Sequence, residues 1–284
     1  MSIKKEKGFS IIELMVVIAI VAILTSAGLL YTKSKREDAK IAGALQFRNS
    51  LNNVLGAYIV GSWKFEGSNG EEGYDDSGYE NDCSLKGSGG TALYVSSVHN
   101  SLGQALRIKN RWLDCGTSDN RPNLFSPIIT MEAWAKANSL SNNKRGIVTN
   151  KYSDNYGINL YMSNNNIGAR IGNGTTFKDI TTDWKPSIGD WYHIAVTYNP
   201  KNQKAILYVN GKIEKELSSG VLSYRSGTNF FAIGCNLKSN AGNCSNNGLF
   251  DGDIDEVKIY NESLIFAQIK KNYAQGLKRL GFSQ

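Results

Sequence analysis

Four acidic residues stand close together near the end of the chain: Asp251, Asp253, Asp255 and Glu256. In a β-strand, alternation would place the three aspartates on one face. Carboxylates gathered in this way act as general acid and base in hydrolysis, or hold a cation. The spacing also matches part of an EF-hand loop, but its sixth position, which needs glycine, holds Glu256. We therefore reject an EF-hand and expect a strand here.

A further acid, Glu13, lies where a charge is costly. It interrupts an almost wholly apolar stretch, residues 9–31, whose longest run is about the length of a membrane span. A carboxylate inside such a run costs several kcal/mol unless a partner compensates it. Glu13 is therefore a candidate functional residue.

The cysteines indicate structure and not metal chemistry. Cys83, Cys115, Cys235 and Cys244 form no C-x-x-C pair, and the chain has only two histidines, so we expect no zinc site. An even number of cysteines in an exported domain indicates two disulfides. Cys235 and Cys244 close a short Asn/Gly/Ser-rich loop, which suits local pairing and would leave Cys83 for Cys115. The sequence alone allows three connectivities.

Three regions of different composition must position these residues. A basic leader precedes the apolar stretch, helix-compatible sequence continues to about residue 60, and Gly, Asn, Ser and Tyr dominate from residue 61. A secretory signal has the same order of parts, but its apolar core is shorter and ends at a small-residue cleavage site. We expect a membrane anchor, a helical stem and a head large enough to bury its own core.

The string KGFSIIELMVVIAIVAIL resembles the prepilin N-terminus of type IV pilins and type II secretion pseudopilins. The resemblance implies that a membrane peptidase, the prepilin peptidase, cleaves between Gly8 and Phe9, and that the new Phe9 amine is methylated. It also implies an assembly role for Glu13, which would neutralise the Phe9 amine of a neighbouring pilin subunit. Each charge offsets the burial cost of the other only when both are present.

One departure from this pattern concerns proline. Many filament-forming pilins carry a proline midway along the N-terminal helix, whereas residues 9–60 contain none. The absence favours a minor pilin over the major subunit. A pseudopilin of a type II secretion or DNA-uptake system is the alternative.

The region beyond residue 61 alternates short β-type runs with Gly/Asn/Ser turns. Around ten strands of this kind predict an antiparallel two-sheet sandwich or jelly roll. The fold class we expect is α+β, with a long N-terminal helix, a β-sandwich and a short C-terminal helix. The predicted segments are a leader (1–8), an anchor and stem helix (9–60), a β-sandwich head (61–275) and a C-terminal helix or tail (264–284).

Several of these strings, in this order, resemble a laminin G-like domain of the concanavalin A-like lectin/glucanase superfamily. They are WKFEGSNGEEGYDDSGYENDCSLKG, ALRIKNRWLDCG, ITMEAWAKA, DWYHIAVTYNPKNQKAILYVNGK and FDGDIDEVKIYNESL. The resemblance implies a jelly roll that binds carbohydrate or protein ligands. Glycosidases of this superfamily carry Glu-x-Asp-x-x-Glu, which the acidic string lacks, so we expect no enzyme.

The laminin G-like resemblance also implies one structural Ca²⁺ between the first loop and the last strand. The matching positions are Asp76, Asn81 and Asp255, whose oxygens suit calcium. A hydrogen-bonded polar clasp without metal is the alternative.

The charge is spread along the chain. The formal net charge is +7, yet no run of five basic residues occurs. DNA is therefore a possible but less favoured partner beside other pilin subunits and a glycan or protein ligand. We expect the protein in the inner membrane before assembly and on the cell surface afterwards.

Overall fold

The computed structural model describes residues 11–12, 14–22, 40, 43, 56–66, 72–89, 91–96, 103–218, 220, 222–224, 228–237 and 244–279. The chain divides into two compact units, Met1–Ala57 and Tyr58–Gln284. In the first unit, residues 11–12 and 14–22 are α-helical. Within the described part of the chain, no helix combines the length and apolar character that a membrane span requires.

The second unit is the β-sandwich head. One sheet has the order β14-β13-β12-β7-β18-β5-β4, with β1 also paired to β18, and the other has the order β11-β10-β9-β8-β15-β6-β3-β2. The strands of the first sheet are β1 (Ile59–Trp63), β4 (Thr91–Ser96), β5 (Gln104–Lys109), β7 (Ile129–Ala137), β12 (Trp191–Asn199), β13 (Lys204–Val209), β14 (Lys212–Ser218) and β18 (Gly252–Tyr260). Those of the second are β2 (Glu72–Gly73), β3 (Cys83–Lys86), β6 (Trp112–Thr117), β8 (Arg145–Ser153), β9 (Tyr156–Met162), β10 (Ile167–Asn173), β11 (Phe177–Thr181) and β15 (Phe230–Ile233).

Alternation along the strands builds the core between the two sheets. In β9, Ile158, Leu160 and Met162 belong to the buried core cluster. Asn159 and Tyr161 therefore point to the opposite, outer face of the second sheet. Across the core, Trp63 of β1 stacks on Phe231 of β15 with ring centroids 5.4 Å apart. The described strands pair antiparallel, as the sequence predicted.

The first strand begins earlier than the sequence predicted. β1 starts at Ile59, whereas the stem helix was expected to run to residue 60. Ile59 and Val60 are β-branched and suit a strand, and Val60 is buried in the core. Pairing with β18 therefore determines the conformation of these two residues.

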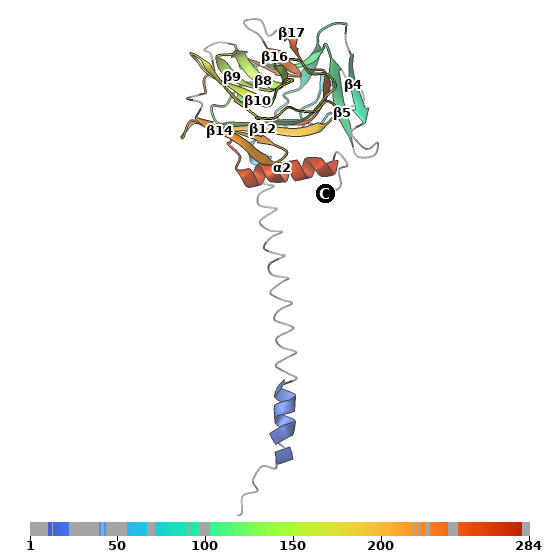
Figure 1. Ribbon diagram of the computed structural model, residues 1–284, viewed down its shortest axis with the longest axis vertical. Helices are drawn as coiled ribbons and strands as arrows, with labels where there is room; N and C mark the ends of the chain where they lie inside the picture. The colour runs from blue at the N-terminus through green and yellow to red at the C-terminus, as the bar shows by residue number, and fades with distance from the viewer. Residues whose placement is uncertain are drawn as a thin grey trace, which may run out of the picture. The chain divides into compact units, whose positions relative to one another are not determined.

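Helix α2 (Phe266–Arg279) covers the outer face of the first sheet, below β12 and β14 in Figure 1. Tyr273 stacks on Trp134 of β7 with centroids 5.5 Å apart. Gly276 lies so close to Trp134 that a Cβ there would fall 2.1 Å from the indole nitrogen. Asn272 donates to the buried carboxylate of Glu132 at 2.9 Å. The predicted C-terminal helix is therefore an integral layer of the head.

A small hairpin, β16 (Cys235–Leu237) and β17 (Cys244–Leu249), lies over the outer face of the second sheet. Figure 1 shows it above β8, on the side away from β12. The approach is close, because a Cβ at Gly146 of β8 would meet the Cys235 backbone at 2.2 Å. The hairpin and the second sheet together position the candidate site.

Candidate functional site

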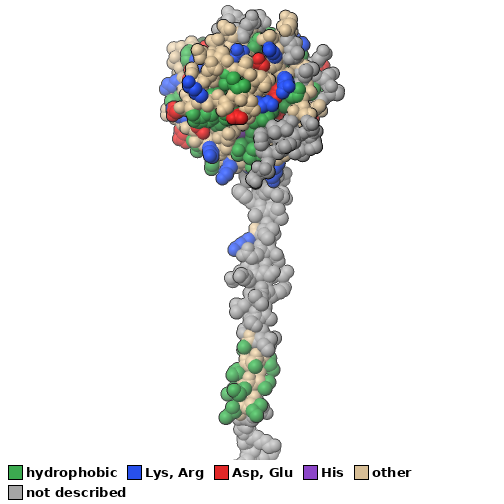
Figure 2. Space-filling view, turned by 45° about the vertical axis from the view of Figure 1, so that its right-hand side comes forward, with side chains coloured by type: hydrophobic (Ala, Val, Ile, Leu, Met, Phe, Trp, Pro, Cys, Tyr) green, Lys and Arg blue, Asp and Glu red, His purple; other side chains and the backbone are tan. Residues whose placement is uncertain are grey.

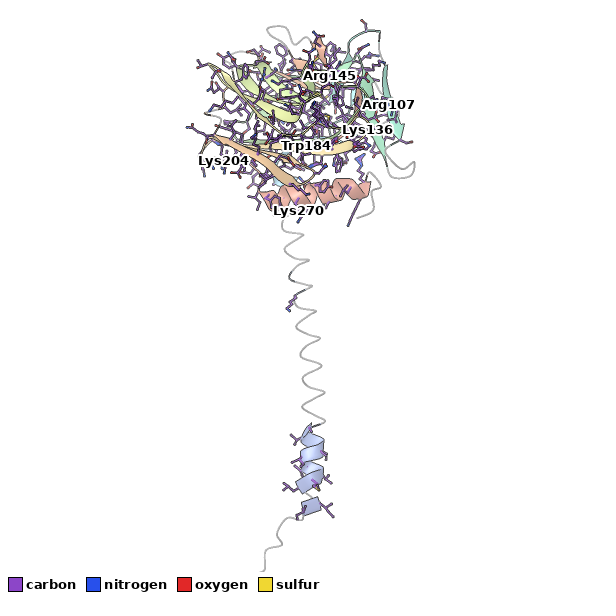
Figure 3. All side chains as sticks on the ribbon, viewed as in Figure 1. Arg107, Lys136, Arg145, Trp184, Lys204 and Lys270 are labelled. Atoms are coloured by element: carbon purple, nitrogen blue, oxygen red, sulfur yellow. A yellow bond between two sulfur atoms is a disulfide. The ribbon has the colours of Figure 1, made fainter. Side chains whose placement is uncertain are left out.

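A polar cleft opens between the outer face of the second sheet and the β16–β17 hairpin. Its volume is about 270 Å³. The residues that line it are Asn142, Asn143, Lys144, Asp154, Arg170, Asn236, Asn247 and Gly248. Arg145, labelled in Figure 3, links the start of β8 to the hairpin, because its Nη1 donates to the Leu249 carbonyl at 2.7 Å. Segments far apart in the sequence therefore meet at one cleft.

A chain of ion pairs forms the floor of this cleft. Arg170 of β10 donates from Nη1 to Asp154 at 2.6 Å and from Nε to Asp179 at 2.9 Å. Lys144 extends the chain at Asp179, with a distance of 2.7 Å between Nζ and Oδ2. Lys151 extends it at Asp154, with 2.6 Å between Nζ and Oδ1. Three cations thus share two carboxylates.

The ion pairs keep both carboxylates charged. Burial raises the pKa of Asp154, but the charges and hydrogen bonds of Lys151 and then Arg170 outweigh it and leave the pKa below its ordinary value. Burial likewise raises the pKa of Asp179, and hydrogen bonds from Arg170 and Lys144 more than reverse the effect. Both acids are therefore hydrogen-bond acceptors at neutral pH.

Polar groups near the cleft are left partly unsatisfied. Asn236 donates to the Lys144 carbonyl at 3.0 Å, yet its buried Oδ1 has no hydrogen-bond partner among the described residues. The buried hydroxyl of Tyr161 also lacks a partner there, and Lys144 Nζ lies 5.1 Å from the centre of its ring. Buried polar atoms normally find partners, so such atoms beside a cleft point to water or ligand.

Next to the cleft, Arg170 packs on an exposed aromatic ring. Its guanidinium carbon lies 3.7 Å from the ring centroid of Phe177, whose side chain stays 38% exposed. Gly168 and Gly172 flank Arg170 on the same face of β10 and add no side chains. The guanidinium is thus held by two carboxylates and a ring. The glycines on either side are closely packed, because a Cβ at Gly168 would fall 2.8 Å from the Ile180 carbonyl oxygen and one at Gly172 would clash with the Asn155 backbone.

The acidic string that the sequence singled out belongs to a different surface and is heavily paired. Asp253 is buried between Arg107 at 2.7 Å and Lys136 at 2.8 Å. Asp251 accepts from Ser139 at 3.0 Å. Glu256 forms ion pairs with Lys258 and Arg279.

The loop of the predicted calcium site is organised by Asp75, which the sequence analysis passed over. Its carboxylate accepts from the backbone N–H groups of Ser62 at 2.8 Å, Ser77 at 2.9 Å and Asn81 at 3.0 Å. Asp76 is instead half exposed and 3.5 Å from Lys64 Nζ. Asn81 donates from Nδ2 to the Val60 carbonyl at 2.7 Å, beside the core residue Trp63.

The third predicted ligand, Asp255, lies under α2 and already faces a cation. It pairs in register with Trp134, and its Oδ1 is 3.3 Å from Arg279 Nη2. Burial raises the pKa of Asp255 well above its ordinary value, although Arg279 opposes the shift. The same guanidinium donates to the carbonyl of Lys64, which follows β1, at 2.8 Å and to the carbonyl of Gln104, the first residue of β5, at 3.2 Å.

The three residues of the implied calcium set have protein partners, but two of their oxygens do not: Asn81 Oδ1 and Asp255 Oδ2 are buried and have no hydrogen-bond partner within the described residues. Asp76 serves Lys64, Asn81 serves the core side of β1, and Asp255 serves Arg279. Within the described residues, no group of three His, Cys, Asp or Glu side chains lies close enough together to hold a metal ion, but calcium also binds amide and backbone carbonyl oxygens. Calcium binding at these positions stays a prediction that the structure does not test.

The structure contains the two disulfides that the sequence favoured among its three connectivities. Cys83 bonds Cys115, joining β3 to β6, and Cys235 bonds Cys244, closing the hairpin over the cleft. The processing and assembly residues Gly8, Phe9 and Glu13 lie outside the described residues, so their roles stay predictions.

No sequence motif pointed to the cleft, because its charged residues come from three strands and two loops. One feature of the sequence could have indicated the site: a single Arg on the polar face of β10 and a single Asp on that of β11. Arg170 and Asp179 are partners in the β10–β11 register. That register cannot be read without knowing the turn between the strands.

Comparison with known proteins supports both parts of the chain. Residues 117–270 match the family model of the concanavalin A-like lectin/glucanases superfamily, and residues 3–29 match that of the prokaryotic N-terminal methylation motif. No curated protein matches the chain.

Among solved structures, domain 4 of the extracellular arabinanase AbnA from Geobacillus stearothermophilus, in complex with arabinotriose, is 20% identical. The match covers 76% of this chain and 98% of that domain, with a TM-score of 0.57. The binding domain of Paraclostridial Mosquitocidal Protein 1 is 18% identical, with 78% of this chain and 53% of that one covered and a TM-score of 0.54. A Trypanosoma rangeli sialidase is 15% identical, with 80% and 34% covered and a TM-score of 0.53. At these identities the likeness shows the fold alone.

The fold and the sequence define a class of protein in which a prepilin N-terminus is followed along the chain by a jelly-roll domain. The chain belongs to the concanavalin A-like lectin/glucanases superfamily, since the model covers more than half of its residues. Its N-terminus makes it a type IV pilin-like protein, which implies a membrane-anchored precursor, a prepilin peptidase and other pilin subunits.

Proposed function

We propose that this chain is a minor subunit of a type IV pilus-like filament and that its head binds carbohydrate at the polar cleft. The observation that carries the proposal is the cleft itself, a built polar site on a lectin-like head. A pocket with a few fixed polar groups is the usual form of a binding site. The related arabinanase domain was solved with arabinotriose, which agrees with a carbohydrate ligand.

We propose that the head binds its ligand and does not act as an enzyme. A glycosidase needs one carboxyl group whose pKa is raised, so that it can protonate the leaving oxygen. Asp154, which lines the cleft, and Asp179, which pairs with the cleft residues Lys144 and Arg170, both have lowered pKa values because cations surround them. Two permanently ionised carboxylates suit hydrogen bonding to hydroxyls better than acid catalysis.

The filament part rests on the methylation motif and on the absence of proline from residues 9–60, which favours a minor over a major subunit. Its test is mass spectrometry of filaments sheared from the cell surface. We expect a minor component that begins at methylated Phe9. Gly8→Val should block maturation and leave the full precursor in the membrane. A protein that retains Met1 or Ser2 and never leaves the membrane would refute the filament role.

A further inference from the structure

We infer that the cleft takes a neutral, hydroxyl-rich glycan and discriminates against glycans that carry carboxylate or sulfate groups. The inference rests on the proposed carbohydrate-binding function and narrows its ligand class. Three features of the cleft support it: the pairing of its charges, the exposure of its charged side chains, and the amide groups on its rim.

The positive charges of the cleft are already committed. Lys144 and Arg170 both contact Asp179, and Arg170 and Lys151 both contact Asp154, all at 3.0 Å or less. An acidic sugar would have to compete with these intramolecular carboxylates for the same cations. Truncating or displacing one member of such a pair leaves the other charge unpaired, which is costly in a half-buried site.

The most accessible charge in the cleft is negative. The Asp154 side chain is 43% exposed, whereas the cations that line the cleft are less exposed, Lys144 at 27% and Arg170 at 11%. An anionic ligand that entered would meet this carboxylate first, and like charges repel. A hydroxyl group, in contrast, can donate to the carboxylate with no charge to compensate.

The rim carries neutral groups that match hydroxyls. The side chains of Asn142, Asn143 and Asn247 are exposed around the cleft. Each amide offers two donors and one acceptor, and each sugar hydroxyl offers one donor and two lone pairs. A rim of amides above a carboxylate therefore satisfies hydroxyls at several positions, while the cations that line the cleft, Lys144 and Arg170, are already paired with Asp154 and Asp179.

The size of the cleft limits how much of a glycan it contacts. Its volume of about 270 Å³ lies below the roughly 300–1,000 Å³ of pockets that enclose a drug-sized ligand. The exposed face of Phe177, next to Arg170, extends the surface beyond the cleft. The structure thus suits one unit of a longer chain, with a neighbouring unit against the ring.

The test is binding of the detergent-purified full chain to immobilised polysaccharides of both classes, neutral ones such as arabinan and xylan and acidic ones such as polygalacturonate and heparin. We expect binding to at least one neutral polymer and none to the acidic ones. Asn143→Ala and Asn247→Ala remove exposed rim amides without touching the core, and each should weaken binding several-fold. Asp154→Asn removes an acceptor charge and should weaken it about tenfold.

Asn202→Ala is the matched control, because Asn202 is an exposed amide in the turn between β12 and β13 of the other sheet. It should bind as the wild type does. Binding to acidic polymers alone, or binding to acidic and neutral polymers alike, would overturn this inference and leave a carbohydrate-binding head in place. Binding to neither class would overturn the proposed function itself. Neutral binding that all the variants retain would place the site elsewhere on the head.

Discussion

Asp179 is a single residue whose ion pairs stabilise the site. Its two oxygens accept from Arg170 and from Lys144, and its pKa lies below the ordinary value of 3.8. A carboxyl group whose pKa is lowered by folding stabilises the folded state above its unfolded pKa. The stabilisation disappears as the pH falls through the folded value.

Asp179→Asn should therefore lower the free energy of unfolding by about 1 kcal/mol at neutral pH, the order expected for a partly exposed pair. The difference from the wild type should shrink as the pH falls below 3.8, because protonation removes the same charge from the wild type. Thermal melts between pH 7 and pH 3 measure it. Asp183→Asn is the control, since Asp183 also pairs with a lysine but is largely exposed, and it should have little effect. A wild-type-to-variant difference that is constant with pH would contradict the ion-pair account.

Glu13 is the residue on which assembly should depend. Its carboxylate lies in an apolar run and needs the cleaved Phe9 amine of a neighbour to offset burial. Glu13→Ala should insert in the membrane at normal levels but enter filaments poorly. Immunoblots of membrane and sheared-filament fractions measure both quantities. Equal amounts of wild type and variant in filaments would exclude the pairing.

The periodicity of the sequence predicted the strands and the helix of the head better than it predicted the residues of the cleft. The runs ITMEAWAKA and DWYHIAVTYN were expected as strands and are β7 and β12. In β12, bulky residues recur at every second position and belong to the core: Tyr192, Ile194, Val196 and Tyr198. The C-terminal run was expected as a helix from the spacing of Ile269, Tyr273 and Leu277, which pack on the sheet. The cleft could not be predicted, because Asp154, Arg170 and Asp179 meet only through strand register and Asn236 through the hairpin above them.

Helix α2 brings its own cation to the sheet. Arg279 forms ion pairs with Glu66, Asp255 and Glu256. Asp255 is the residue at which the predicted calcium ion would contact the last strand. Arg279 also links β1 to β5, since it bonds the carbonyls of Lys64 and Gln104. A guanidinium held in this way contributes charge and donors together.

We therefore expect a calcium chelator to leave the melting temperature of the wild-type protein unchanged. Arg279→Met should destabilise the head by about 3 kcal/mol, because it leaves the buried carboxyl group of Asp255 without its cation. Lys270→Met, at an exposed position of the same helix labelled in Figure 3, should have almost no effect. A chelator that lowers the wild-type melting temperature would instead support calcium at Asp76, Asn81 and Asp255.

At the scale of the whole molecule, two kinds of interaction are separated along the chain. The N-terminal residues carry the motif for processing and assembly, and the head carries the cleft. The net charge of +7 comes from basic residues that are spread along the sequence. On the face in Figure 2, the lysines and arginines of the described residues are interspersed with acids and neutral side chains. On that face, the distribution favours a specific polar site over a DNA-binding surface, which would need a continuous basic patch.

The central claim is that a filament presents this head as a carbohydrate-binding module. The most direct measurement passes sheared surface filaments over an immobilised neutral polysaccharide that the purified protein binds. Filaments from cells with the wild-type chain should be retained, and filaments with the Asn143→Ala, Asn247→Ala double variant, present in equal amount, should flow through. Retention that does not depend on these two amides, or filaments that contain none of this protein, would contradict the account.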